Sequence, residues 1–178
     1  MKNESTIKKI YDFVSILLTA IIAVSIIFTF AFKISAVNGS SMQNTLQDGN
    51  KVLITALDFK IKYGDIVIIS QPNAYEKVLI KRVIATENQK IIIDSEKNTI
   101  TVDGIVLDEP YIREKELNWQ GDNTYPITVP KGKVFVMGDN RNYSADSRDN
   151  GVGMIDTRYI MGKAFYRIGD KALLKLEK

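Results

Sequence analysis

The sequence contains no cysteine and no histidine. The absence of cysteine excludes disulfides, thiolate zinc sites and a cysteine nucleophile. The absence of histidine means that imidazole cannot activate a serine nucleophile, which leaves Lys, Asp, Glu or Tyr as its general base. Any serine-based catalysis by this chain must therefore use a base other than histidine.

The sequence also lacks a long run of basic residues. A formal net charge of +3 and a pI near 8.9 are only mildly basic, so we expect no nucleic-acid partner. There is no internal repeat and no low-complexity tract. With 178 residues, 45% of them apolar, the chain has the size of one domain and enough apolar side chains for a core.

One long apolar run is present near the N-terminus, at residues 14–32. At ~1.5 Å rise per residue, these roughly 19 residues form a helix of about 28 Å, close to the ~30 Å hydrocarbon core of a bilayer. Three lysines precede the run and Lys33 alone flanks its other end, so the positive-inside rule places the N-terminus in the cytoplasm. The pattern predicts a single-pass cell-membrane protein with a cytoplasmic N-terminus at 1–10, a transmembrane anchor at 11–33 and an extracytoplasmic domain at 34–178.

A cleaved secretory signal peptide is the alternative interpretation of this run. Small residues at Val37-Asn38-Gly39 lie near a possible cleavage point. However, the apolar region of a signal peptide usually spans about 7 to 15 residues, which is shorter than this run. A buried core helix is disfavoured because the run has no polar face. The length therefore favours a retained anchor.

After the apolar run the pattern becomes typical of β-strands. Asp103-Gly104 between Thr101-Val102 and Ile105-Val106-Leu107 predicts a tight hairpin, because its turn needs positive φ angles. Residues 108–131 are polar and rich in turn residues, which predicts a surface excursion. Short apolar runs predict strands at 51–54, 64–70, 76–85, 89–94, 99–102, 105–107, 134–137 and 160–168.

Lys81 and Arg82 interrupt the predicted strand at 76–85. Side chains alternate along a strand, so Lys81 shares its face with the apolar Leu79 and Val83. A lysine that acts as a base near pH 7–8 needs its pKa lowered from ~10.4 by ~3 units, and full burial can supply about 3 to 5 units. The strand pattern alone favours the simpler alternative of a solvated pair at a sheet edge.

Two further segments are candidates for a site. Gly39 and Ser40 precede Ser41, and such small residues let a substrate backbone approach while the Ser41 amide donates to an oxyanion. Alone, this composition is typical of an ordinary turn. Residues 138–148, Gly-Asp-Asn-Arg-Asn-Tyr-Ser-Ala-Asp-Ser-Arg, predict a rigid polar loop after a strand, because their charges can neutralise one another. We call residues 138–148 the scaffold loop.

Together the three segments resemble the type I signal peptidases, membrane-bound serine proteases that use a serine and lysine dyad. Ser41-Met42-Gln43-Asn44-Thr45-Leu46 matches the pattern Ser-Met-x-Pro-Thr-Leu of that family, with Asn44 in place of the proline. Lys81-Arg82 matches the Lys-Arg pair that follows an apolar residue. The scaffold loop matches nearly in full, with Tyr143 where an asparagine is common.

The resemblance implies roles for individual residues: Ser41 as nucleophile, Lys81 as general base, Gly39 beside the oxyanion, Ser144 as the hydrogen-bond partner that orients Lys81, Asp139 as the partner of Arg82, and Asp146 as the partner of Arg148. Gly39 has no hydroxyl, so the second oxyanion donor would be a backbone N–H or a water. A lysine has a flexible stem, so fixed partners are needed to aim it at the nucleophile.

The resemblance further implies a mainly β fold, an antiparallel β-sheet catalytic domain with a small β insertion at about 88–131, preceded by one transmembrane helix. Its substrates would be secretory precursors with small side chains at the first and third positions before the cut. It implies no cofactor and no metal. Three alternatives stay open: a catalytically silent homologue that binds precursors, a peptidase specialised for one secretion or pilus pathway, and a self-cleaving relative of the serine and lysine repressors. Those repressors carry a DNA-binding module, whereas this chain begins with the apolar run.

Overall fold

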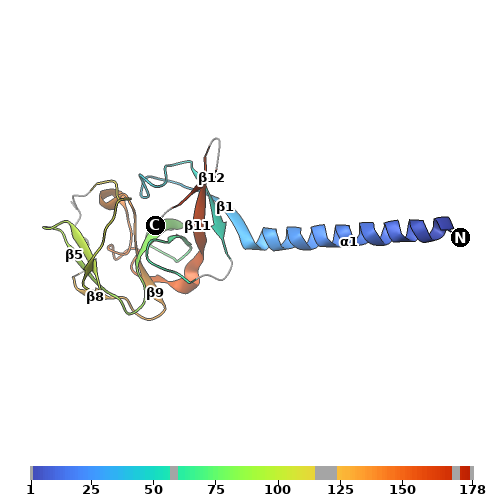
Figure 1. The fold of residues 1–178 in the computed structure, drawn as a ribbon. Coiled ribbons are helices and arrows are strands. Elements are labelled where there is room, and N and C mark those ends of the chain that lie inside the picture. The colour runs from blue at the N-terminus through green and yellow to red at the C-terminus, as the bar shows by residue number, and fades with distance from the viewer. Residues whose placement is uncertain (1, 57–59, 115–123, 170–172, 177–178) are drawn as a thin grey trace.

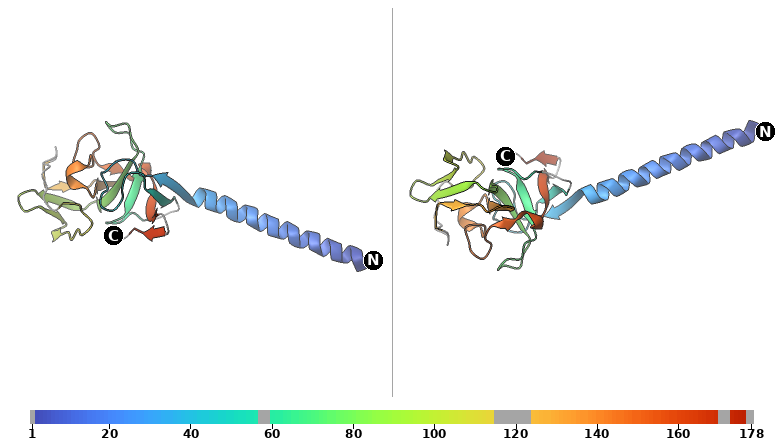
Figure 2. Two further views of the ribbon diagram at one scale, coloured as in Figure 1. Left: turned by 90° about the horizontal axis from the view of Figure 1, so that it is seen from above. Right: turned by 90° about the horizontal axis from the view of Figure 1, so that it is seen from below.

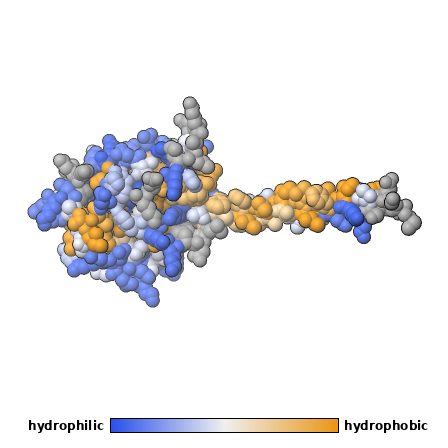
Figure 3. All heavy atoms as spheres, viewed as in Figure 1, coloured by the Kyte–Doolittle hydropathy of each residue, from blue (hydrophilic) through white to orange (hydrophobic). Residues whose placement is uncertain are grey.

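A long N-terminal helix projects from a β-sheet body in the computed structural model (Figure 1), which describes residues 2–56, 60–114, 124–169 and 173–176. Helix α1 (Lys2–Ala31) extends away from the body as a rod in every view (Figure 2). Within Thr6–Ala31, an 18-residue window has a mean hydropathy of 2.6, and none of that window is buried against the body. Figure 3 shows apolar surface along most of α1. By length and composition, it is the one helix among the described residues that could cross a membrane.

The helix ends earlier than the predicted anchor. Phe32 and Lys33 belong to strand β1 (Phe32–Ala36) and not to the helix. Phe32 pairs with Thr55 of strand β2 (Lys51–Thr55), and the Ala56 N–H donates to the Ala31 carbonyl over 3.0 Å. The helix therefore ends just before Phe32, the first residue that pairs with a distant strand, and the apolar run alone does not mark this boundary.

The body is built on a large antiparallel sheet, which confirms the predicted mainly β fold. Its strand order is β1-β2-β11-β3-β4-β9-β10, with β12 paired to β11. Strand β3 is buried along its whole length, as its apolar run predicts. The remaining bounds are β3 (Ile66–Ile69), β4 (Leu79–Ala85), β9 (Lys133–Met137), β10 (Ile155–Asp156), β11 (Ile160–Ile168) and β12 (Leu173–Lys175).

A second, four-stranded sheet has the order β7-β6-β5-β8 and lies within the predicted 88–131 insertion. The predicted hairpin is present, since Asp103 and Gly104 have φ angles of +51° and +83°. Strand β8 was not predicted individually, because its two residues lie in the predicted surface excursion. Residues 115–123 of that excursion lie outside the described residues. The bounds are β5 (Lys90–Asp94), β6 (Thr99–Val102), β7 (Ile105–Val106) and β8 (Ile127–Thr128).

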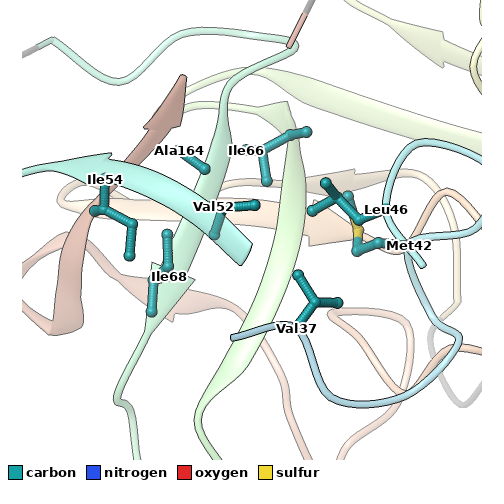
Figure 4. Packing of buried hydrophobic residues seen from close by; sticks show 8 residues of the cluster. All are labelled: Val37, Met42, Leu46, Val52, Ile54, Ile66, Ile68 and Ala164. Atoms are coloured by element: carbon teal, nitrogen blue, oxygen red, sulfur yellow. The ribbon is translucent and has the colours of Figure 1, made fainter. Parts of the chain in front are cut away.

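Three hydrophobic clusters hold these elements together. One cluster packs on one face of β2, β3 and β11 (Figure 4), and a second packs on the other face of β3. The alternation along β3 explains the division, since Ile66 and Ile68 enter the first cluster whereas Val67 and Ile69 enter the second. The third cluster joins β4 and β9 to the second sheet. Strand β4, which carries the candidate base Lys81, is therefore packed against all three clusters.

Candidate active site

The segment around Ser41 lies between β1 and β2 and is anchored in the core. Met42 and Leu46 are fully buried and pack with Val37 and residues of β2 and β3 (Figure 4). A backbone hydrogen bond of 2.8 Å from Leu46 N–H to the Met42 carbonyl closes the turn. Ser41 itself is partly exposed. Its hydroxyl is thus presented by a short turn whose apolar neighbours fix its place.

Lys81 lies on β4 with its amine at the nucleophile. Its side chain is buried, at 3% exposure, and Nζ lies 2.7 Å from Ser41 Oγ. Burial lowers the pKa of Lys81 to about 8, with Arg148 acting in the same direction and the Asp146 and Asp139 carboxylates opposing it. A sizeable fraction of this amine is therefore neutral near pH 8, and a neutral Nζ can accept the Ser41 proton over the same contact. The solvated edge pair that the strand pattern favoured is not formed.

Arg82 points to the other side of β4 and holds the scaffold loop. Its guanidinium donates to both Asp139 carboxylate oxygens, from Nε over 2.8 Å and from Nη2 over 2.7 Å, and both side chains are fully buried. Arg82 Nη1 donates to the Gly64 carbonyl over 3.0 Å. Thr45, from the nucleophile segment, donates its hydroxyl proton to Asp139. The pair of Arg82 and Asp139 named from the sequence therefore links all three motifs.

Asp146 and Arg148 form a second buried pair, as the resemblance implied. Arg148 donates to Asp146 from Nε over 2.8 Å and from Nη2 over 2.9 Å. The Gly138 N–H donates to the same carboxylate over 3.0 Å. Burial acts to raise the pKa of Asp146, but the charge and hydrogen bonds of Arg148 outweigh it and hold that pKa below its ordinary value. The scaffold loop thus carries a fixed negative charge close to Lys81.

The predicted hydrogen bond from Ser144 to Lys81 is wrong for this structure. Ser144 is buried, but its Oγ has no hydrogen-bond partner among the residues described. The hydroxyl lies instead against Gly138, where an added Cβ would be 2.3 Å from Ser144 Oγ and 2.4 Å from the Ser41 carbonyl oxygen. The missing side chain of Gly138 is what lets the scaffold loop approach the nucleophile segment this closely.

Gly138→Ala is expected to reduce both stability and activity. A methyl group at this position must displace either the Ser144 side chain or the Ser41 backbone, at a typical overpacking cost of about 1–3 kcal/mol. Thermal unfolding and peptide cleavage by the full chain measure the two effects. Gly104→Ala is the matched control, because its Cβ would meet no atom within 4 Å and only its positive φ is strained. The control should lose some stability and keep its activity, whereas full activity of Gly138→Ala would contradict the close approach.

Gly39 has the positive φ of +94° that favours glycine, and it borders the site. Its N–H donates to Asp48 Oδ1 over 2.6 Å, so this amide is already engaged. Within the described part of the chain, the Ser41 N–H donates to no protein atom. The Ser41 amide is therefore the backbone donor left for an oxyanion beside the nucleophile.

A cleft of about 760 Å³ opens beside Ser41 and Lys81. Strand β1 and the chain leading to Ser41 form one wall, and residues 76–81 form the other. Strand β1 is the last strand of the large sheet, so its outer edge carries no neighbouring strand within the described residues. The cleft is lined mainly by apolar side chains, among them Ile34, Ile54, Ile68, Leu79 and Ile80. Its apolar lining and the open edge of β1 suit an extended peptide.

Comparison with known proteins identifies the family. The family model described as signal peptidase, peptidase S26, matches residues 10–168. The chain belongs to the signal peptidase family. The signal peptidase I of Bacillus licheniformis is 34% identical over 174 residues, and the match covers 90% of each chain. The signal peptidase IB of Staphylococcus aureus strain COL is 30% identical over 177 residues, again covering 90% of each chain.

A solved signal peptidase I, the crystal structure from Enterococcus faecalis V583, is 25% identical with a TM-score of 0.46, covering 59% of this chain and 97% of that chain. As a signal peptidase this chain is a hydrolase of the class that removes signal peptides. The resemblance drawn from the three motifs is confirmed by the family match.

Sequence reasoning missed several residues that surround the signal peptidase motifs. Thr45 was quoted within the first motif without a role, yet it contacts Asp139. Glu109, Tyr111 and Arg113 lie in the predicted surface excursion but contact the scaffold loop or Arg82. No pattern in the sequence signals these contacts, because they join segments that are distant along the chain.

Proposed function

We propose that the chain is a membrane-bound serine endopeptidase that removes signal peptides from secreted precursors, with Ser41 as nucleophile and Lys81 as general base. The observation that carries the proposal is the 2.7 Å contact between the Lys81 amine and Ser41 Oγ. Burial lowers the pKa of that amine to about 8, so it can serve as a base without a metal or a histidine. The family match supports the reaction class.

In the proposed reaction, Ser41 Oγ attacks the scissile carbonyl carbon and its proton passes to Lys81 Nζ. The resulting oxyanion accepts a hydrogen bond from the Ser41 N–H. The Lys81 ammonium then returns the proton to the departing amine, the C–N bond breaks, and the signal peptide is left as an ester on Ser41. A water molecule gives its proton to Nζ and attacks the ester carbonyl. The Lys81 ammonium returns that proton to Ser41 Oγ as the ester bond breaks, which releases the signal peptide with a free carboxyl group and restores Ser41.

The proposed substrates are extended chains with small side chains at the first and third positions before the cut, as the resemblance of the motifs implies. In an extended chain alternate residues point to the same side. Two such residues would face the same wall of the cleft, to which Ile68, Leu79 and Ile80 contribute apolar side chains. The open edge of β1 offers backbone groups that an extended substrate can pair with.

The position of the site supports action at a membrane surface. Helix α1 runs directly into β1, and β1 forms part of the cleft wall that leads to Ser41. With α1 in a bilayer, the cleft would lie close to the lipid surface. The lysines before the apolar run favour a cytoplasmic N-terminus, so the proposed catalytic domain is extracytoplasmic.

The decisive experiment is cleavage of a synthetic precursor peptide by the full chain in detergent micelles. The peptide carries alanine at the first and third positions before the expected cut, and mass spectrometry identifies the products. We expect one cut after the first of these positions, and none when that alanine is replaced by a bulky residue. Ser41→Ala should show no cleavage above background. Binding of the peptide without turnover by the wild type would support a catalytically silent homologue instead.

A further inference from the structure

A segment of the insertion returns from the second sheet to the catalytic motifs. Residues 109–114, which we call the strap, follow β7 and lie against the scaffold loop. The Arg113 N–H donates to the Asp139 carbonyl over 3.1 Å. Glu109 accepts two hydrogen bonds from Arg141, from Nη1 over 2.8 Å and from Nη2 over 2.6 Å. This ion pair is nearly dry, with side-chain exposures of 8% for Glu109 and 1% for Arg141.

Tyr111 is the centre of the strap. The Arg82 guanidinium carbon lies 3.8 Å from the centroid of its ring, which is the geometry of a cation–π contact. The Tyr111 hydroxyl donates to Glu109 over 2.8 Å and lies 3.2 Å from the Tyr63 hydroxyl. Burial, together with the Glu109 carboxylate, raises the pKa of Tyr111, so it stays neutral. The ring therefore covers the guanidinium that pairs with Asp139.

The strap also reaches the nucleophile segment. Arg113 Nη1 donates to the side-chain oxygen of Gln43 over 2.6 Å. In the middle of the scaffold loop, the Asn142 side-chain amide donates to Glu114 over 2.8 Å. The strap thus contacts all three motifs. The cleft beside Ser41, in contrast, is lined by no residue of the strap.

We propose that the strap is a positioning element for the Ser41 and Lys81 dyad, and that Tyr111 acts by keeping the Arg82 and Asp139 pair dry and closed. The inference rests on the proposed function of that dyad. Tyr111 does not contact the reacting atoms and acts through Arg82. Its removal should change how well Lys81 works as a base and should leave the cleft, and so substrate binding, as it was.

The direction of the change follows from the charges around Lys81. Asp146 and Asp139 favour its protonated form, whereas burial and Arg148 favour the neutral form. The groups that face Tyr111 are Arg82, Glu109 and Tyr63. Without the ring, water reaches Arg82 and weakens its hold on Asp139. Weaker desolvation of Lys81 and a less neutralised Asp139 carboxylate both raise the pKa of Lys81, so less of its amine is neutral at a given pH.

The test compares Tyr111→Leu with Tyr111→Phe in the full chain. For Tyr111→Leu we expect the acid limb of the kcat profile to move up by about one pH unit and kcat at pH 8 to fall about fivefold, with KM changed less than about twofold. Tyr111→Phe keeps the ring over Arg82, so the acid limb of its kcat profile should lie at the same pH as in the wild type. Tyr159→Leu, an exposed tyrosine outside the strap, is the matched control and should behave as the wild type.

A second measurement does not depend on turnover. Trace acetylation across a pH series, quantified by mass spectrometry, follows the neutral amine of Lys81 against the exposed Lys97 as an internal reference. We expect the Lys81 midpoint near pH 8 in the wild type and a higher midpoint in Tyr111→Leu. An unchanged midpoint would overturn the role of the strap. If the wild type cleaves no precursor and the midpoint still moves, the proposed function fails and the effect of Tyr111 on Lys81 stands.

Discussion

Lys81→Met is expected to abolish peptide cleavage and, at pH 7, to make the chain more stable than the wild type. A buried methionine has a similar length to lysine and fits the apolar surroundings, but it cannot accept the Ser41 proton. General-base catalysis contributes about 10²–10⁴-fold to such reactions, so turnover should fall by at least that factor. A gain in stability with a loss of activity separates a buried functional amine from a structural one.

The stability gain follows from the pKa of Lys81, which burial lowers from 10.5 to about 8. At about 1.36 kcal/mol per unit, keeping this amine protonated in the fold costs about 3 kcal/mol at pH 7. Between pH 8 and 10.5 the unfolded chain binds more protons than the folded chain, so this cost disappears as pH rises. The wild type should therefore gain stability across that window, and Lys81→Met should lack this contribution.

Thermal unfolding of the full chain in detergent micelles, followed by circular dichroism at pH 7 and at about pH 9.5, measures this effect. Lys97→Met is the matched control, because the Lys97 side chain is 78% exposed. It should leave both activity and unfolding nearly unchanged. A Lys81→Met chain that is less stable than the wild type at pH 7 would show that the amine is not desolvated as the structure has it.

Arg82→Met should give the largest loss of stability of any single substitution considered for this chain. The side chains of Arg82 and Asp139 are both completely buried, with exposures of 0%. Removing the guanidinium leaves a buried carboxylate without its partner, which typically costs about 3–5 kcal/mol. It also frees Asp139 to stabilise the protonated form of Lys81, so any folded fraction should have a weaker base.

The comparison for this prediction is Arg158→Met, which removes a paired arginine whose side chain is 83% exposed. That change should have little effect, because an exposed ion pair contributes little to stability. The double variant Arg82→Met with Asp139→Leu should recover part of the lost stability, since no unpaired charge remains, without recovering activity. Equal unfolding temperatures for Arg82→Met and Arg158→Met would contradict a dry pair at the centre of the site.

Features that depend on neighbouring residues were predicted well. The apolar run became α1, the two-residue turn at Asp103 and Gly104 became the hairpin, and most short apolar runs became strands. These patterns report local geometry, which a sequence contains directly. Boundaries were less accurate. Strand β4 begins at Leu79, after a turn in which Glu76 has a positive φ of +51°, so the predicted strand started too early.

Within the site, some contacts could also be predicted from the sequence and others could not. The ion pairs of Arg82 with Asp139 and of Asp146 with Arg148 could be named from the motifs. The orientation of Ser144 could not, because it depends on how closely Gly138 lies to two other segments. Tyr111 could not be found either. Its ring meets Arg82 only because the second sheet directs the strap back onto the large sheet.

The sequence by itself determined that the chain has one membrane-length helix, a β-strand body and a serine that has no histidine to activate it, because composition and short periodic patterns are properties of neighbouring residues. Only the tertiary structure decided that Lys81 is dry, lies 2.7 Å from Ser41 Oγ and has its pKa lowered to about 8. The physical reason is that desolvation depends on which distant segments exclude water from an amine, and those segments meet only in the folded chain.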